Sequence, residues 1–185
     1  MLVLTQTPWS PNDLKSLTNL ISIAKNEGVC QSGLDKPDIL LLLPHSPMTD
    51  NNVLDEEMFF KDIKSIATKK KIYIAGSAVL RAKNESAPQT IGFLISNDGE
   101  CLLRVPKISP DLIEGFTNTT SALGEKANFP VATLPFAKVG LLCGEDIHFS
   151  QYSRVLAFNG AEIILNPSIE KSDHQYDHRI MSRFA

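Results

Sequence analysis

One unbroken apolar run, Ile39–Leu43, limits the fold of this chain more than any other feature of its sequence. Asp38 precedes the run and Pro44 ends it, and no polar residue alternates with the apolar ones. This pattern predicts a strand that is covered on both faces, because a strand with one solvated face shows alternation. The run is also too short to cross a bilayer. A strand buried on both faces needs a layer of structure on each side, which favours an α/β fold.

Apolar bursts alternate with amphipathic stretches along the rest of the chain, as they do in α/β proteins. The segment Asn97–Gly99 predicts a tight hairpin, since Asp-Gly supplies residues that tolerate a positive φ. A helix is predicted at 55–69, and its inward residues are expected to be Met58, Phe59, Ile63 and Ile66. The other predicted strands lie at 2–4, 72–76, 91–96, 101–105, 139–143 and 163–166, with further helices starting at 11–13 and spanning 151–159.

The composition indicates a single domain over residues 1–185. With 185 residues and 43% hydrophobic content, the chain can bury a sizeable core. The net charge is -3 and the only basic run, Lys69–Lys71, follows a predicted helix, so we expect a solvated helix end and no nucleic-acid site. The three cysteines lack metal-ligand spacing and no secretory segment opens the chain, so we expect a soluble, reduced, cytoplasmic protein that does not bind membranes.

The order of several short motifs is the most specific feature of the sequence. These motifs are Gln6, Pro44, Ala75-Gly76, Asn97-Asp98-Gly99, Lys107, Ile113–Phe116, Lys138–Gly140 and Asn159–Ser168. In this order they resemble the nitrilase (carbon-nitrogen hydrolase) superfamily over the whole chain, most specifically from Gly160 to Ser168. The resemblance implies a nitrilase-type αββα sandwich, in which two sheets pack between helices, and a hydrolase-like site of the amidase or nitrilase kind.

The resemblance also implies which residues form that site. In the superfamily a glutamate takes the proton of a cysteine thiol, the thiolate attacks an amide or nitrile carbon, and a lysine stabilises the developing charge. Lys107 matches the family lysine, and Glu114 matches a second glutamate that helps to hold the site. The resemblance implies no cofactor.

Two chemical positions depart from the family pattern. His45 stands where the family has its glutamate, and Gly144 stands at the spacing from Gly140 at which the family has its cysteine. Cys143 comes one residue early. Because side chains of a strand alternate between faces, we expect the Cys143 sulfur to point into packing on the opposite side of the sheet. A glycine cannot attack a carbon, so these departures predict a non-catalytic relative.

Two further departures lie after the cysteine position. Phe149-Ser150-Gln151 replaces the family's Phe-Pro-Glu. The family also continues with more strands after the helix in which this chain stops, at Arg183–Ala185. The resemblance therefore implies a sandwich that is incomplete at its C-terminal end. We expect a second copy of the chain or another subunit to cover the exposed sheet edge, since unpaired edges invite association.

The pair His174 and His178 is a weak candidate for a metal site. Its spacing places both rings on one face of a helix with Asp177 nearby, and such a pair can bind zinc. No third ligand follows at a recognisable spacing. A solvated helix face is the favoured interpretation, and we expect no metal.

Three functions stay open. The first is a pseudoenzyme that binds a small amide or carboxylate ligand, or a partner subunit, through His45, Lys107, Glu114 and Gly144. The second is an active thiol-dependent amidase or nitrilase, in which a local bulge brings Cys143 into the pocket with His45 as its base. The third is a structural fragment without a function of its own. We favour the first, and the position of the Cys143 sulfur distinguishes it from the second.

Overall fold

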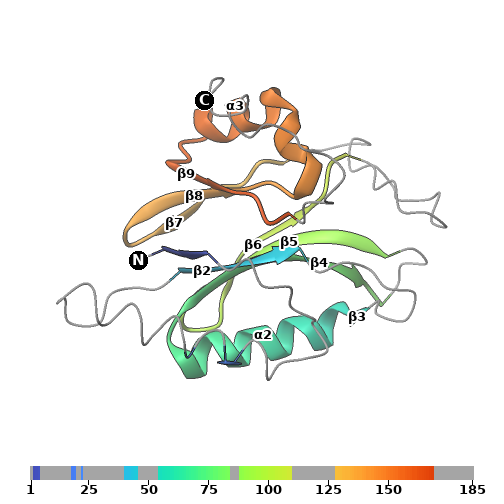
Figure 1. The fold of residues 1–185 in the computed structure, drawn as a ribbon, viewed down its shortest axis with the longest axis vertical. Helices are drawn as coiled ribbons and strands as arrows, with labels where there is room; N and C mark the ends of the chain where they lie inside the picture. The colour runs from blue at the N-terminus through green and yellow to red at the C-terminus, as the bar shows by residue number, and fades with distance from the viewer. Residues whose placement is uncertain are drawn as a thin grey trace.

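The structure is a computed structural model, and the part of the chain that it describes stacks in four layers (Figure 1). Two sheets lie face to face, α2 (Glu56–Lys70) covers the outer face of one sheet, and α3 (Ser150–Phe158) covers the outer face of the other. The predicted αββα sandwich is therefore confirmed. The described residues are 2–4, 18, 19, 22, 40–45, 54–83, 88–109 and 128–168, so most of the helix predicted from 11–13 lies outside them.

The larger sheet is mixed. Its strands in the described residues are β1 (Leu2–Leu4), β2 (Leu40–His45), β3 (Leu54–Asp55), β4 (Tyr73–Arg81), β5 (Gln89–Ile95) and β6 (Cys101–Pro106). Their order is β1-β2-β4-β5-β6, with β3 also paired to β4. The strands from β1 to β4 run parallel, whereas β4, β5 and β6 pair antiparallel. This arrangement excludes an all-parallel sheet of the Rossmann kind.

The smaller sheet consists, in the described ranges, of β7 (Ala132–Leu134), β8 (Ala137–Leu141) and β9 (Ile163–Leu165). β7 pairs antiparallel with β8, and β8 pairs parallel with β9. The connection from β8 to β9 runs through a short 3-10 helix, η2 (Gly144–His148), and then α3. β7 is absent from the predictions because it is very short and Pro130 and Pro135 flank it.

The space between the two sheets holds one hydrophobic core, and the space beneath α2 holds another. Leu40 of β2 packs between the sheets, whereas its neighbour Leu41 packs toward α2. The apolar run that predicted a strand buried on both faces thus supplies both cores. Among the described residues, the core between the sheets has these buried members: Leu40, Tyr73, Ala75, Leu94, Leu103, Val105, Ala132, Leu134, Val139, Leu141, Cys143 and Leu165.

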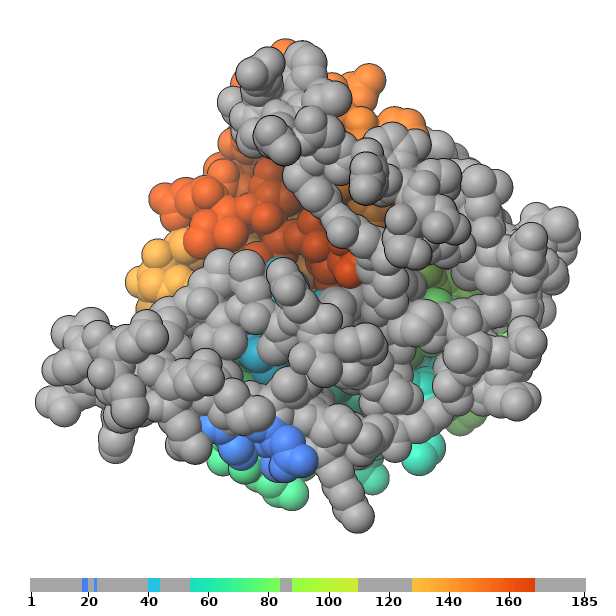
Figure 2. All heavy atoms as spheres, viewed as in Figure 1, coloured from blue at the N-terminus to red at the C-terminus, as the bar shows by residue number. Residues whose placement is uncertain are grey.

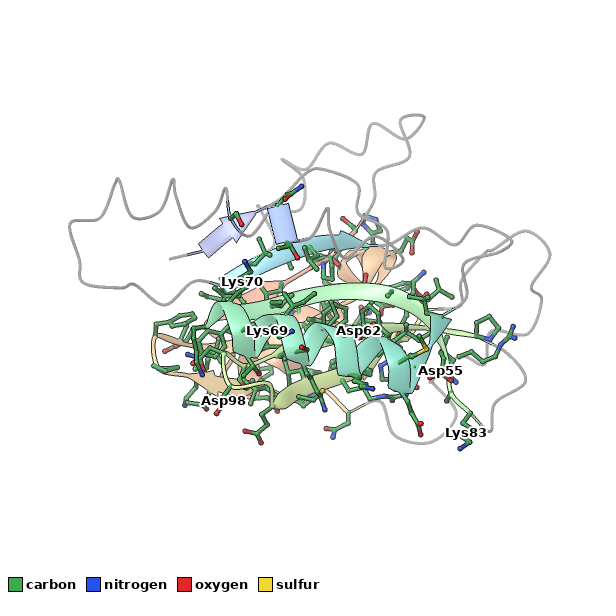
Figure 3. The ribbon with its side chains drawn as sticks, turned by 90° about the horizontal axis from the view of Figure 1, so that it is seen from below. Asp55, Asp62, Lys69, Lys70, Lys83 and Asp98 are labelled. Atoms are coloured by element: carbon green, nitrogen blue, oxygen red, sulfur yellow. The ribbon has the colours of Figure 1, made fainter. Side chains whose placement is uncertain are left out.

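Residues that stabilise helix ends stand at both ends of α2 (Figure 3). The Asp55 carboxylate accepts a hydrogen bond from the Met58 backbone N–H at 2.9 Å, which caps the first turn. Lys69 and Lys70 fill the last turn, where cations stabilise the helix dipole, so the basic run is a helix end as predicted. Lys71 ends the helix with a left-handed backbone, φ 53°.

The buried face of α2 differs in part from the prediction. Phe59, Ile63 and Ala67 are buried and lie four residues apart, so they define the face that contacts the sheet. Met58 is 67% exposed, and its predicted inward position is wrong. Its place next to Phe59 turns it about 100° away from the buried stripe, because an α-helix turns once every 3.6 residues.

The hairpin between β5 and β6 is confirmed, with a different turn from the one expected. Gly99 has φ 89°, and it is the only residue of Asn97–Gly99 with a positive φ. The Ser96 backbone N–H donates to the Glu100 carbonyl at 2.8 Å and closes the loop. The Asp98 carboxylate accepts a hydrogen bond from the Ser96 hydroxyl, which lowers the pKa of Asp98 below its usual value. Glycine alone supplies the left-handed conformation that this loop needs.

Candidate active site

The predicted site residues come from the ends of several strands. His45 is the last residue of β2, Lys107 directly follows β6, and Gly144 begins η2 just after β8. Glu114 lies outside the described residues, as do His174 and His178. In the described ranges no group of three or more histidine, cysteine, aspartate or glutamate side chains could hold a metal ion.

Cys143 lies in the core between the two sheets. Its backbone is extended, with φ -112° and ψ 118°, so the alternation of β8 continues through it. Leu141 and Cys143 pack between the sheets, whereas Leu142 packs with Leu156 of α3. The Cys143 side chain is fully buried, and its thiol donates to the Val105 carbonyl at 3.8 Å. The prediction that this sulfur points into packing is confirmed.

Gly144 lies beside Lys107. Its φ is 54°, in the left-handed region that glycine adopts without strain. A Cβ placed on Gly144 would lie 3.9 Å from Cε of Lys107, an ordinary van der Waals contact. The Cβ positions of Cys143 and Gly144 therefore point in different directions. Of these two positions, it is Gly144 that lies against Lys107, and it has no side chain.

Lys107 is held at the end of β6 and is almost fully buried. Its backbone N–H donates to the Thr90 carbonyl at 2.8 Å and extends the pairing of β5 with β6. Its side chain is 7% exposed, and Nζ lies 2.5 Å from Oε2 of Glu145. The Glu145 side chain is 69% exposed. A buried ammonium requires a counter-charge, and this carboxylate supplies one.

Asp146 joins the lysine segment to the glycine turn. It is 1% exposed, and its two carboxyl oxygens accept hydrogen bonds from the backbone N–H groups of Ile108, at 2.9 Å, and Ser109, at 2.7 Å. These bonds fix the backbone just after Lys107 against the turn that contains Gly144. Asp146 is not among the predicted site residues. Its neighbours Glu145 and His148 are polar, so no local pattern marks it as a buried residue.

A backbone carbonyl connects the larger sheet to the same turn. His45 is paired in register with Ser77, and the buried Ser77 hydroxyl donates to the Pro167 carbonyl at 3.3 Å. The Gly144 backbone N–H donates to that carbonyl too, also at 3.3 Å. Figure 2 shows the red region around β9 and a small part of β2, in cyan, on the same face of the molecule. The structure thus brings Lys107 and Gly144 together and places the end of β2 nearby, while the predicted approach of Glu114 stays a prediction.

Two buried side-chain oxygens near these residues lack a hydrogen-bond partner among the described atoms. They are Oγ of Ser109 and Oδ1 of Asn166, which neighbours Pro167. A buried polar atom without a partner costs about 1–3 kcal/mol. Such atoms are rare in folded proteins, and a ligand or an ordered water can satisfy them.

Comparison with known proteins agrees with this fold. An amidase from Nesterenkonia sp. superposes with a TM-score of 0.74 at 19% identity, covering 97% of this chain and 67% of that chain. Nit3 of Saccharomyces cerevisiae, a member of branch 10 of the nitrilase superfamily, superposes with a TM-score of 0.72 at 16% identity, covering 98% and 69%. No curated protein sequence matches the chain.

A sequence profile of the carbon-nitrogen hydrolase family matches residues 44–184. The match begins at the end of β2 and covers every later strand, α2 and α3. It includes His45, Lys107, Cys143 and Gly144. The chain therefore belongs to the carbon-nitrogen hydrolase family.

Proposed function

We propose that this chain is a non-catalytic member of its family that binds a small ligand with an amide or carboxylate group beside Lys107 and Gly144. One observation carries this proposal. Of the two consecutive positions Cys143 and Gly144, the one whose Cβ would contact Lys107 is a glycine, whereas the thiol of Cys143 is buried between the sheets. A thiol hydrolase needs its sulfur within reach of the group that stabilises the developing charge.

Lys107 can still bind a ligand although the site has no nucleophile. An ammonium group donates charge-assisted hydrogen bonds to carbonyl and carboxylate oxygens. Its position is fixed by the β5 pairing of its own backbone and by the Asp146 bonds to the next two residues. Binding to a preformed group costs less ordering entropy than binding to a mobile one.

The structural relatives supply a useful contrast. One Nesterenkonia amidase structure shows acrylamide added to an active-site cysteine. In the present chain, a sulfur with access to Lys107 would have to come from position 144, where glycine stands. The alternative, an active hydrolase that uses Cys143 with His45, would require the thiol to leave its packed position between the sheets.

We expect no thiol-dependent release of ammonia from short amides, glutamine, carbamoyl amino acids or simple nitriles. Loss of a covalent nucleophile removes on the order of 10⁴- to 10⁶-fold in rate. Ammonia should stay at the background level in the wild type and in Cys143→Ala. Binding of the same compounds, followed by NMR shifts of backbone amides, should be lost in Lys107→Ala and kept in Cys143→Ala.

Ammonia release that depends on the cysteine would contradict the proposal. If wild-type protein liberates ammonia and Cys143→Ala does not, the thiol reaches the site and the chain is an active hydrolase.

A further inference from the structure

We propose that Glu145 determines which ligands the site accepts, because its carboxylate already occupies Lys107 and selects neutral amides over carboxylates. This inference rests on the proposed function and names the residue that sets its specificity. The supporting contact is the ion pair between Nζ of Lys107 and Oε2 of Glu145, at 2.5 Å.

The two partners of this ion pair differ in their exposure. The Lys107 side chain is 7% exposed and is held in place, whereas the Glu145 side chain is 69% exposed. Glu145 thus extends from the solvent side onto a fixed, buried ammonium. A ligand oxygen that binds the Lys107 ammonium would share it with Glu145.

The position of Glu145 makes it a competitor for the ligand. Glu145 directly follows Gly144, and a Cβ on Gly144 would lie 3.9 Å from Cε of Lys107. A group bound beside Gly144 therefore meets both members of the ion pair. A ligand carboxylate would have to displace Glu145 or lie against a like charge, which is unfavourable at such short range.

A primary amide has the complementary pattern. Its carbonyl oxygen accepts a hydrogen bond from the Lys107 ammonium, and its N–H groups donate to the Glu145 carboxylate. Both members of the ion pair then keep a partner, and no second negative charge enters the site. The Glu145 side chain alone would thus make the site prefer an amide over a carboxylate of equal size.

The test compares acetamide with acetate, which have nearly the same size and shape and differ in charge. Their affinities are measured from the NMR shifts of the backbone amides of Gly144 and Ser109 in the wild type and in Glu145→Gln. We expect the wild type to bind acetamide more tightly. In Glu145→Gln the affinity for acetate relative to acetamide should rise about tenfold, because the competing charge is gone.

Two further variants complete the comparison. Glu145→Ala removes the carboxylate without adding an amide and should shift the preference in the same direction. Glu57→Gln removes one negative charge from the first turn of α2, in the layer outside the larger sheet, and should leave the preference unchanged. A shift in Glu57→Gln as large as that in Glu145→Gln would show an effect of net charge alone and would overturn the inference.

The remaining outcomes separate this inference from the proposed function. If both probes bind in a Lys107-dependent way and the Glu145 variants keep the wild-type preference, the inference is overturned and the proposed function stands. If neither probe binds to any variant, both are overturned.

Discussion

Replacing Asp146 by alanine is expected to lower the free energy of unfolding by about 3 kcal/mol, because the change leaves two buried backbone N–H donors without an acceptor. Those donors belong to Ile108 and Ser109, and both bind the Asp146 carboxyl group in the wild type. The measurement is chemical denaturation followed by far-UV circular dichroism. Asp146→Asn should lose less, since its side-chain oxygen still accepts one hydrogen bond.

Ser109→Ala is the matched control for this variant. It keeps the Ser109 backbone N–H that binds Asp146 and removes a buried hydroxyl that lacks a partner among the described atoms. We expect its free energy of unfolding to stay within about 0.5 kcal/mol of the wild type, or to rise. A stable Asp146→Ala, with an unchanged affinity for ligands at Lys107, would show that Asp146 does not hold the site together.

Gly92→Ala is expected to lower the free energy of unfolding by about 2–3 kcal/mol, because the added methyl group overpacks the core between the sheets. A Cβ on Gly92 of β5 would lie 2.1 Å from Cδ2 of Leu141 and 2.6 Å from Sγ of Cys143. Both contacts are far shorter than van der Waals distances, and both partners are buried. The sheets would have to move apart, or both side chains would have to shift.

A double-mutant cycle with Leu141→Ala tests the cause of this effect. Leu141→Ala opens space at the closest contact, so Gly92→Ala should cost at least about 1 kcal/mol less in that background than in the wild type. Equal costs in the two backgrounds would mean that β5 and β8 do not approach closely here. The cycle also reports on Cys143, because its sulfur shares the same space opposite Gly92.

The larger elements could be predicted because their signals are local. The apolar run Ile39–Leu43 indicated a strand with two covered faces, and the hydrophobic pattern of 55–69 indicated α2. The position of Cys143 also followed from local reasoning, since alternation along a strand requires only the register of the neighbouring residues. The family motifs supplied the order of the layers.

Other features depend on contacts between distant segments, and no local pattern contains them. Asp146 bonds to residues far earlier in the chain, and Gly92 is needed because β8 approaches β5 across the core. The ion pair of Lys107 with Glu145 joins the end of β6 to η2 in the same way. The inward position predicted for Met58 was wrong because apolar character alone does not fix which residue lies at the centre of a helix face.

The most direct test of this account is the reactivity of the thiol at position 143 in the folded protein. Iodoacetamide is added to native wild type and to native Gly144→Cys, and each cysteine is followed by peptide mass spectrometry. Cys101 is an internal reference, since it is half-buried and burial raises the pKa of its thiol. Gly144→Cys is expected to fold, with a cost of about 1–2 kcal/mol for a side chain in the left-handed region.

We predict that Cys143 stays unmodified in both folded proteins and reacts only after denaturation, because its sulfur lies between the sheets. The cysteine introduced by Gly144→Cys should react in the folded state, since its direction leads to Lys107 and the site. Alkylation of Cys143 in folded wild type at a rate equal to or above that of Cys101 would contradict the account. That result would place the thiol within the site and favour an active hydrolase.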